Sequence, residues 1–327
     1  MKVQELKELL KAADREFLEK AFVESYKHFT KYQKEEADQI IKDILSGINP
    51  NKTKKKAEIP FESLKQEITE FIENARAQNY LFPNRIIPKN QRPKWRFLVK
   101  NFLKELQKVS QENENYGESV NLLVELYRLV SDACSYDFFS TDDAFRSIGW
   151  EQEDFFRLVA IRVLGMGYTR ENISRLILYA STGGLSAESV HADQQIVLLS
   201  ELKTTDAKYI ALEETKKLID ENAEKLNGLK KYDTQKYFLE DTINNFCDMV
   251  LMIHIVLAEL EEGISYYFKV NKEREKEIIL YKALRLAEWL DEDDSWLQIY
   301  EYGIKKKIKP RDYLVRGYQE RKDIREF

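Results

Sequence analysis

The histidines and cysteines come first as candidates for chemistry, and they are few, with 3 His and 2 Cys in 327 residues. Glu188 and His191 stand at the Glu-x-x-His spacing from which helical bundles build di-metal sites. Such a site needs a second pair, and the remaining histidines do not supply one. Cys247 and His254 are two helical turns apart, too far for a nucleophile and its base. We therefore expect no metal and no cofactor.

Adjacent carboxylates are the second candidate chemistry, at Asp142–Asp143 and in the run from residue 291 to 294. Such groups bind Mg²⁺ or transfer protons. Both stand where a helix is expected to begin, and acidic side chains there interact favourably with the helix dipole, so we interpret them as helix caps. The connector around the first pair combines aromatic rings with carboxylates and could line a cleft. Its candidate residues are Phe138, Asp142, Asp143, Phe145 and Trp150.

The basic segment, residues 85–108, has the most unusual local charge. It holds eight Lys and Arg against Glu105, a net 8 − 1 = +7, in a chain whose formal net charge is −5. Cations interleaved with aromatic rings are typical of surfaces that bind phosphate backbones and bases. A second basic run, 305–311, could meet it in three dimensions. The candidate binding residues are Arg85, Lys89, Arg92, Lys94, Trp95, Arg96 and Lys100.

Composition favours an α-helical protein of a reducing compartment. The chain is 43% hydrophobic and 33% charged, with 11 Gly and 6 Pro, so turn-forming residues are scarce. Two cysteines are too few for a disulfide framework. The first 17 residues form an amphipathic pattern without the apolar stretch of a signal peptide. The most apolar run, 246–260, is shorter than the ~20 residues of a membrane span. We expect a cytoplasmic protein without membrane segments.

Apolar residues recur at helical spacing along the chain and predict an all-α fold, either an irregular multi-helical bundle or an α-α superhelix. No fixed repeat period is evident. The strongest pattern predicts a long buried central helix near 232–262, because apolar residues at spacings of three and four continue through it and its other faces are apolar between Met249 and Leu257.

Breaks in this periodicity suggest the domain organisation. Residues 1–47 form an N-terminal helical unit, and the lysine-rich stretch 48–60, which lacks apolar periodicity, is a basic linker. Residues 61–230 form the main helical domain. Residues 231–327 form a C-terminal long-helix hairpin packed on it.

The sequence leaves three classes of function open. We favour a non-enzymatic, cytoplasmic helical interaction or scaffold protein whose surface groove binds another protein, because helical surface is abundant and no catalytic set is present. The alternative is nucleic-acid or polyanion binding through the basic segment. The third possibility is an enzyme that uses carboxylates in a helical cavity, with Glu188, His191, Asp142 and Asp143 as its residues.

Overall fold

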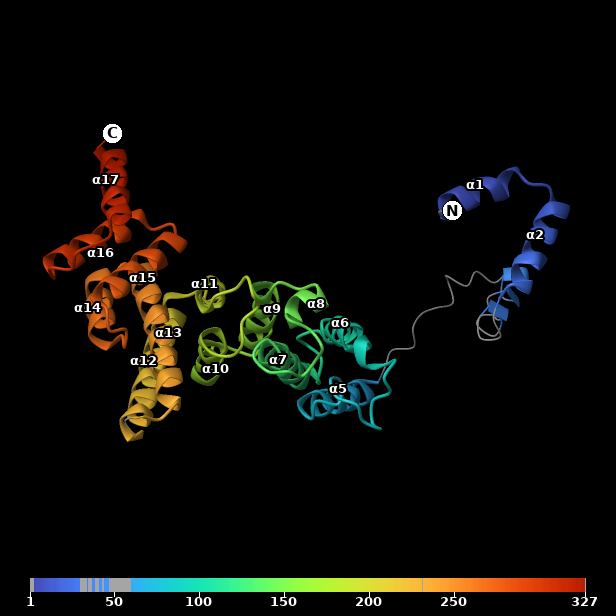
Figure 1. Ribbon diagram of the computed structural model, residues 1–327, viewed down its shortest axis with the longest axis horizontal. Coiled ribbons are helices and arrows are strands. Elements are labelled where there is room, and N and C mark those ends of the chain that lie inside the picture. The colour runs from blue at the N-terminus through green and yellow to red at the C-terminus, as the bar shows by residue number, and fades with distance from the viewer. Residues whose placement is uncertain are drawn as a thin grey trace. The chain divides into compact units, whose positions relative to one another are not determined.

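The described part of the chain is mostly helical and contains no strands, which confirms the predicted all-α multi-helical fold (Figure 1). The computed structural model describes residues 3–29, 34, 37–38, 41–42, 44–46, 60–230 and 232–326. The predicted basic linker lies outside these residues except for Pro60. The chain divides into two compact units, Met1–Pro60 (unit 1) and Phe61–Phe327 (unit 2). Unit 2 continues across the domain boundary predicted at residue 230.

In unit 1, helices α1 (Val3–Ala12) and α2 (Arg15–Lys27) leave apolar side chains exposed. Both helices begin with an acidic residue in the first turn and end with a lysine in the last, as the helix dipole favours. No residue of α2 is buried. Leu9, Phe17 and Phe22 are 61%, 66% and 53% exposed. Helices α1 and α2 therefore carry exposed apolar side chains.

Unit 2 begins with helices packed around the ring of Phe139. Trp95 stacks on this ring with their centroids 4.0 Å apart, and the rings of Phe71 and Tyr80 lie 6.1 and 5.8 Å from it. The α-helices bury residues at helical spacing, as α5 does with Leu64, Ile68, Phe71 and Ala75. The helices are α5 (Phe61–Arg76), a 3₁₀ turn (Arg92–Lys94), α6 (Trp95–Leu106), α7 (Tyr116–Asp132) and α8 (Ala144–Ile148).

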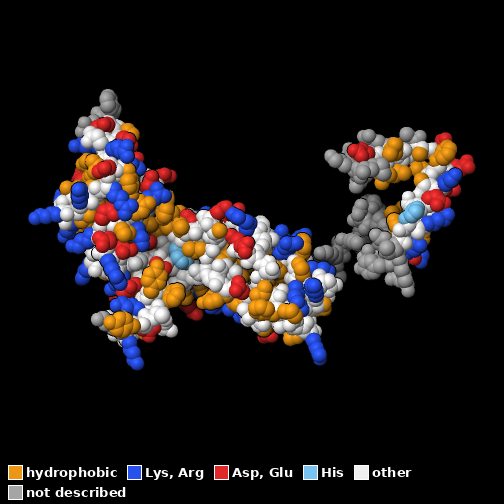
Figure 2. Space-filling model, viewed as in Figure 1, with side chains coloured by type: hydrophobic (Ala, Val, Ile, Leu, Met, Phe, Trp, Pro, Cys, Tyr) orange, Lys and Arg blue, Asp and Glu red, His pale blue; other side chains and the backbone are white. Residues whose placement is uncertain are grey.

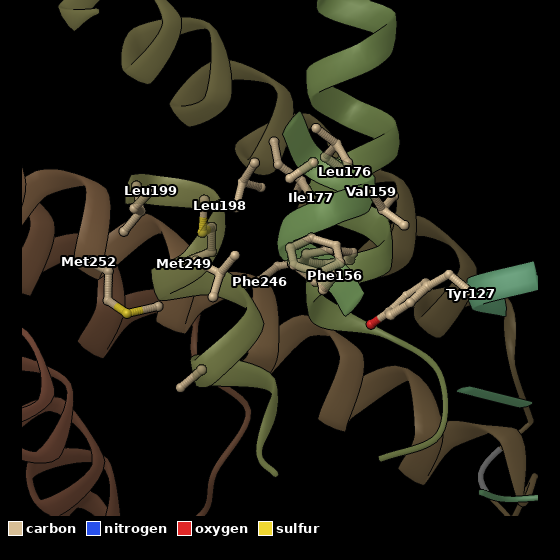
Figure 3. Close-up of a cluster of buried hydrophobic side chains, with 14 of the residues drawn as sticks. Tyr127, Phe156, Val159, Leu176, Ile177, Leu198, Leu199, Phe246, Met249 and Met252 are labelled. Atoms are coloured by element: carbon tan, nitrogen blue, oxygen red, sulfur yellow. The ribbon is translucent and has the colours of Figure 1, made fainter. Parts of the chain in front are cut away.

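The middle of unit 2 holds the central apolar cluster, in which Phe156 and Phe246 are fully buried. Figure 3 shows side chains of this cluster meeting, among them Tyr127 of α7, Phe156 of α9 and Met249 of α13. Burying a ring of this size contributes roughly 2–3 kcal/mol, so the cluster joins sequence-distant segments into one unit. The helices of this part of unit 2 are α9 (Gln152–Gly165), α10 (Arg170–Ser181), α11 (His191–Glu201), α12 (Thr205–Gly228) and α13 (Gln235–Val256).

Helix α13 is the predicted buried central helix, but it ends at Val256 instead of continuing to residue 262. Ala258 has φ of +58°. The N–H of Glu259 donates to the His254 carbonyl (2.9 Å) and that of Ala258 to the Ile255 carbonyl (3.0 Å). This pair of bonds is a Schellman motif, which glycine usually provides. Because alanine instead of glycine occupies this left-handed position, the apolar spacing in the sequence continues past residue 256 and does not indicate that the helix ends there.

The same motif ends three further helices without glycine. Gln78, Asp291 and Lys307 have φ of +59°, +56° and +59°, each with the corresponding pair of backbone bonds. A left-handed residue with a side chain costs roughly 1–2 kcal/mol, which the surrounding packing must offset. The remaining helices are α14 (Leu260–Val270), α15 (Lys276–Trp289), α16 (Asp293–Lys305) and α17 (Asp312–Glu326). Among the described helices, none is both long and apolar enough to cross a membrane.

Candidate functional site

The basic segment forms an exposed cationic surface on and before the first turns of α6. Arg85, Lys89, Lys94, Arg96 and Lys100 are all exposed, and none has an ion-pair partner among the described residues. Figure 2 shows Lys and Arg side chains at this end of unit 2. Figure 1 places α6 and α16 at opposite ends of the unit, so the second basic run does not extend this surface.

Two residues of the predicted basic site have structural roles. Arg92 donates from Nε to the Ile87 carbonyl (3.1 Å) and from a terminal nitrogen to the Asn84 carbonyl (3.3 Å), holding the loop before α6. Trp95 is only 4% exposed and stacks on Phe139, so its ring is not accessible to a base. This corrects its interpretation as a binding residue.

Other aromatic rings lie on the basic surface in place of Trp95. Phe82 and Phe97 are 55% and 54% exposed. The helical spacing of the sequence could have predicted that Phe97 is exposed. Buried positions 95, 99, 102, 103 and 106 define one face of α6, and position 97 lies away from that face.

The carboxylate of Asp143 caps α8 and is saturated with hydrogen bonds. Its Oδ1 accepts from the Arg146 N–H (3.0 Å), while Oδ2 accepts from the Ser186 hydroxyl (2.6 Å) and the Ala187 N–H (3.1 Å). Burial acts to raise the pKa of Asp143, but these bonds outweigh it and leave the pKa below its ordinary value. Asp143 therefore anchors the loop before α11 to the start of α8.

The other connector residues mostly support packing. Phe145 is fully buried and packs near Tyr127 and Phe155, at centroid distances of 5.9 and 6.2 Å. Phe138 and Trp150 are partly buried against the same core, and Asp142 is exposed. The connector is a packed segment that joins α7 to α9.

The four residues of the enzyme hypothesis do not form one site. Glu188 is exposed and forms an ion pair with Arg146. His191, the first residue of α11, instead lines a cavity whose walls include none of the other three. Across the described residues, no three His, Cys, Asp or Glu side chains are grouped as a metal site requires.

The cavity beside His191 (the His191 cavity) has a volume of ≈ 290 Å³ and lies between α11, α13 and α15. Asp248 forms part of its wall and accepts a hydrogen bond from the Tyr267 hydroxyl at 2.7 Å. Burial raises the pKa of Asp248 to about 6, although the Tyr267 bond and the Lys282 charge both lower it. Burial likewise lowers the pKa of His191. The cavity thus holds two groups whose charged forms are disfavoured.

An acidic groove of ≈ 1060 Å³ lies between the α13–α14 turn, α14 and the start of α16. Its lining contains one cation, Lys269, and apolar side chains form part of its surface, with Val256 42% exposed and Tyr266 partly buried. Five carboxylates line it: Glu259, Glu261, Glu262, Glu292 and Asp294. Negative charge and accessible apolar surface therefore share one groove.

Local structure explains why these acids converge. Glu261 and Glu262 occupy the first turn of α14, and Asp294 that of α16, where the helix dipole favours acidic residues. The Schellman turn at Ala258 folds α14 back on α13. Close packing follows, because a Cβ on Gly263 would lie 2.5 Å from the Cβ of His254. Of the predicted acidic run 291–294, Asp293 and Asp294 stand in the first turn of α16, while Asp291 belongs to the turn that ends α15. The convergence of this run with α14 was not predictable from sequence.

Existing partners hold part of the groove in place. Glu259 accepts from the Tyr209 hydroxyl (2.5 Å) and lies 3.4 Å from His254 Nδ1, and Glu262 pairs with Lys216 at 3.4 Å. Glu261 and Glu292 are exposed and have no ion-pair partner among the described residues. These two carboxylates are the ones most available to an incoming cation.

Fold and groove together define a class, an all-α multi-helical protein with an acidic groove beside an internal helix break. No protein-family model matches the chain, and no curated protein or solved structure matches it either.

Proposed function

We propose that this chain is a non-enzymatic protein-interaction module that binds a basic segment of a partner protein in the acidic groove. The observation that carries the proposal is the groove itself, where five carboxylates and one lysine surround accessible apolar side chains. A concave surface of one charge sign concentrates oppositely charged ligands and speeds their association. Apolar contact with Val256 and Tyr266 adds affinity that charge alone does not supply.

The dimensions of the groove suit a short helical or extended segment. Helix α14 has 11 residues and is therefore about 16 Å long, which matches about three turns of a partner helix. An amphipathic segment with lysines or arginines on one face and apolar side chains on the other would satisfy both kinds of surface.

Two further features support an interaction role in the cytoplasm. Helices α1 and α2 of unit 1 expose large apolar side chains, and such patches mark interaction sites in folded proteins. Both cysteines, Cys134 and Cys247, are free, which suits a reducing compartment.

A labelled synthetic peptide, helical with lysines on one face and leucines on the other, tests the proposal. Fluorescence anisotropy should show saturable binding to the full chain. Replacing Glu261 and Glu292 by lysine should weaken it roughly 10-fold or more, because attraction at two positions becomes repulsion. The affinity of the wild-type chain should also fall as salt rises.

The matched control reverses two acids elsewhere. Glu221→Lys with Glu224→Lys changes the net charge equally, at exposed positions on α12 that do not line the groove. This variant should keep its affinity for the peptide within about 2-fold, since distant surface charges are screened. Equal weakening in both variants would mean that the peptide senses only net charge and would refute the groove as its site.

Nucleic-acid or polyanion binding is the second candidate, favoured by the exposed, unpaired cations of the basic segment and by the rings of Phe82 and Phe97. Replacing Lys94, Arg96 and Lys100 by glutamate should abolish binding of a labelled single-stranded oligonucleotide. For milder alanine substitutions, the slope of log affinity against log salt should fall by about 2, or about 0.7 for each lost phosphate contact. Arg92 is left intact because it holds the loop.

The control for this experiment replaces Lys217, Lys225 and Lys230 by glutamate, three exposed lysines outside the basic segment. Binding that persists after reversal of the basic segment, or that falls equally in the control, would rule out this surface as the site.

A further inference from the structure

A second cavity, of opposite charge, lies next to the acidic groove. It has a volume of ≈ 420 Å³ and is formed by α14, the start of α15 and the end of α16. Ser265 and Lys269 line both cavities. The cations of the second cavity are Lys269, Arg274, Lys276 and Lys306, and we call it the basic cavity.

The cations of the basic cavity form no ion pairs in the part of the chain that the structure describes. All four are exposed. The single carboxylate in the lining, Glu273, lies 3.9 Å from Lys282 and accepts the Arg274 backbone N–H at 2.9 Å. Four like charges around one cavity repel each other, and an anion placed between them relieves that repulsion.

Asn271 supplies an independent indication of a ligand. It lines the cavity and is 9% exposed. Its Oδ1 accepts the Glu273 N–H at 2.9 Å, which fixes the amide group, while the buried Nδ2 has no hydrogen-bond partner among the described residues. Buried donors without an acceptor are rare in folded proteins. An oxygen atom of a bound anion would satisfy this one.

The surrounding backbone and rings make the cavity a formed site. The Lys272 N–H donates to Asn244 Oδ1 at 2.7 Å, which ties the α14–α15 connection to α13. Helix α15 begins at Lys276, and the partial positive charge of its N-terminus adds to that of the side chains. Phe268 and Tyr302 pack 5.3 Å apart, and Lys306 Nζ lies 5.2 Å from the Tyr302 ring centroid.

We propose that the basic cavity binds the phosphate groups of a small phosphorylated ligand. Several cations, amide donors and a helix N-terminus are the groups that bind multiply charged phosphate oxygens. The volume exceeds that of a single water or monatomic ion and falls in the range of small-molecule sites. The 305–311 run predicted as basic contributes Lys306, while the other cations come from segments that the sequence did not single out.

Calorimetric titration of the full chain with inorganic tripolyphosphate tests the proposal. One saturable site is expected. Lys306→Ala should weaken binding about 10-fold, because it removes one charge from the cavity. Lys305→Ala, which removes the neighbouring exposed lysine that does not line the cavity, should change the affinity less than about 2-fold. Absence of binding in the wild-type chain, or equal loss in both variants, would overturn the proposal.

Asn271→Asp gives a second, sharper variant. The aspartate keeps an oxygen for the Glu273 N–H but replaces the unsatisfied donor by a negative oxygen, so tripolyphosphate binding should fall at least about 30-fold. An unchanged thermal unfolding temperature would show that the fold is intact. Should this variant unfold, the exposed Lys306 and Lys305 pair decides the question.

Two further measurements identify the binding site and the source of the ligand. The variant with Lys94, Arg96 and Lys100 replaced by glutamate should bind tripolyphosphate normally, and loss of binding there would place the site on the basic segment and refute the proposal. Competition by vesicles containing a phosphorylated lipid headgroup would support the site with a lipid ligand, while competition only by free phosphate esters would support it with a soluble one.

Discussion

Gly184→Ala is expected to lower the free energy of unfolding by about 3 kcal/mol. A Cβ at this position would overlap the backbone carbonyl oxygen of Ser131 and come within 2.6 Å of Ser135 Oγ. A backbone carbonyl in the last turns of α7 cannot move aside as a flexible side chain can, so the added carbon acts as overpacking. Urea unfolding followed by circular dichroism measures the change.

The hydrogen bonds around Gly184 explain why this close approach matters. Its carbonyl accepts from the Ser131 hydroxyl (2.8 Å) and from Gln152 Nε2 (3.2 Å). The Oε1 of Gln152 in turn accepts the Ser186 N–H at 2.8 Å. The glycine thus lets the loop before α11 dock on α7 and α9, and a displaced loop would lose these buried bonds as well.

Gly228→Ala is the matched control, since a Cβ there would meet no atom within 4 Å. It lies at the end of α12, where alanine is the better helix former, so the variant should be neutral or more stable by up to about 1 kcal/mol. A Gly184→Ala protein as stable as the wild type would contradict the close packing of the loop on α7.

Gly183 and Gly184 also show how far sequence reasoning reaches. A glycine pair after a helix predicts a turn, and Gly183 with φ of +100° fits that interpretation. Gly184 is required for a different reason, the proximity of Ser131 and Ser135 at the end of α7, about fifty residues earlier in the chain. Only the three-dimensional packing distinguishes the two roles.

The core was predictable because burial leaves a periodic trace. Four residues at spacings of three and four within the predicted central helix, Ile243, Phe246, Val250 and Ile253, are all fully buried. The end of that helix could not be predicted, because the left-handed position that stops it carries alanine. The chain reversal at this point depends on packing against Gly263.

The cavities could not be predicted for a related reason. The acidic groove combines residues 255–269 with 292–298, and the basic cavity combines 265–279 with 302–308. Two of these stretches overlap runs that are visible in the sequence, the acidic run 291–294 and the basic run 305–311. Only the convergence of all four stretches produces the two charged cavities. The basic segment was visible because its charges are consecutive in sequence, yet helical phase places Trp95 in the core and Phe97 outside.

Asp248→Asn is expected to stabilise the protein near neutral pH, by about 3 kcal/mol at about pH 7.5. The pKa of Asp248 is about 6 in the folded state, against an ordinary value of 3.8, a difference of about 2.2. A raised pKa means that the folded state holds the proton more tightly than the unfolded state does. The contribution of Asp248 to the stability of the folded state is fully present below about pH 3.8 and is lost as pH rises through about 6. Asparagine has no charge to bury and still offers Tyr267 an acceptor.

Urea unfolding of both proteins at several pH values measures this effect. The stability difference in favour of Asp248→Asn should grow by about 2 kcal/mol between about pH 4.5 and pH 7.5. Burial also lowers the pKa of His191, which lines the same cavity. The contribution of His191 to stability is therefore lost as pH falls. Because both proteins contain His191, this contribution largely cancels in the difference between their stabilities.

Tyr267→Phe provides an internal check on the cause. The Tyr267 hydroxyl stabilises the carboxylate form of Asp248, so removing the hydroxyl should raise the pKa of Asp248 further. The pH-dependent loss of stability should then occur at higher pH. A difference between wild type and Asp248→Asn that stays constant with pH would show that Asp248 is not desolvated. That result would contradict the burial of this carboxylate in the wall of the His191 cavity, because burial is the main cause of the raised pKa of Asp248.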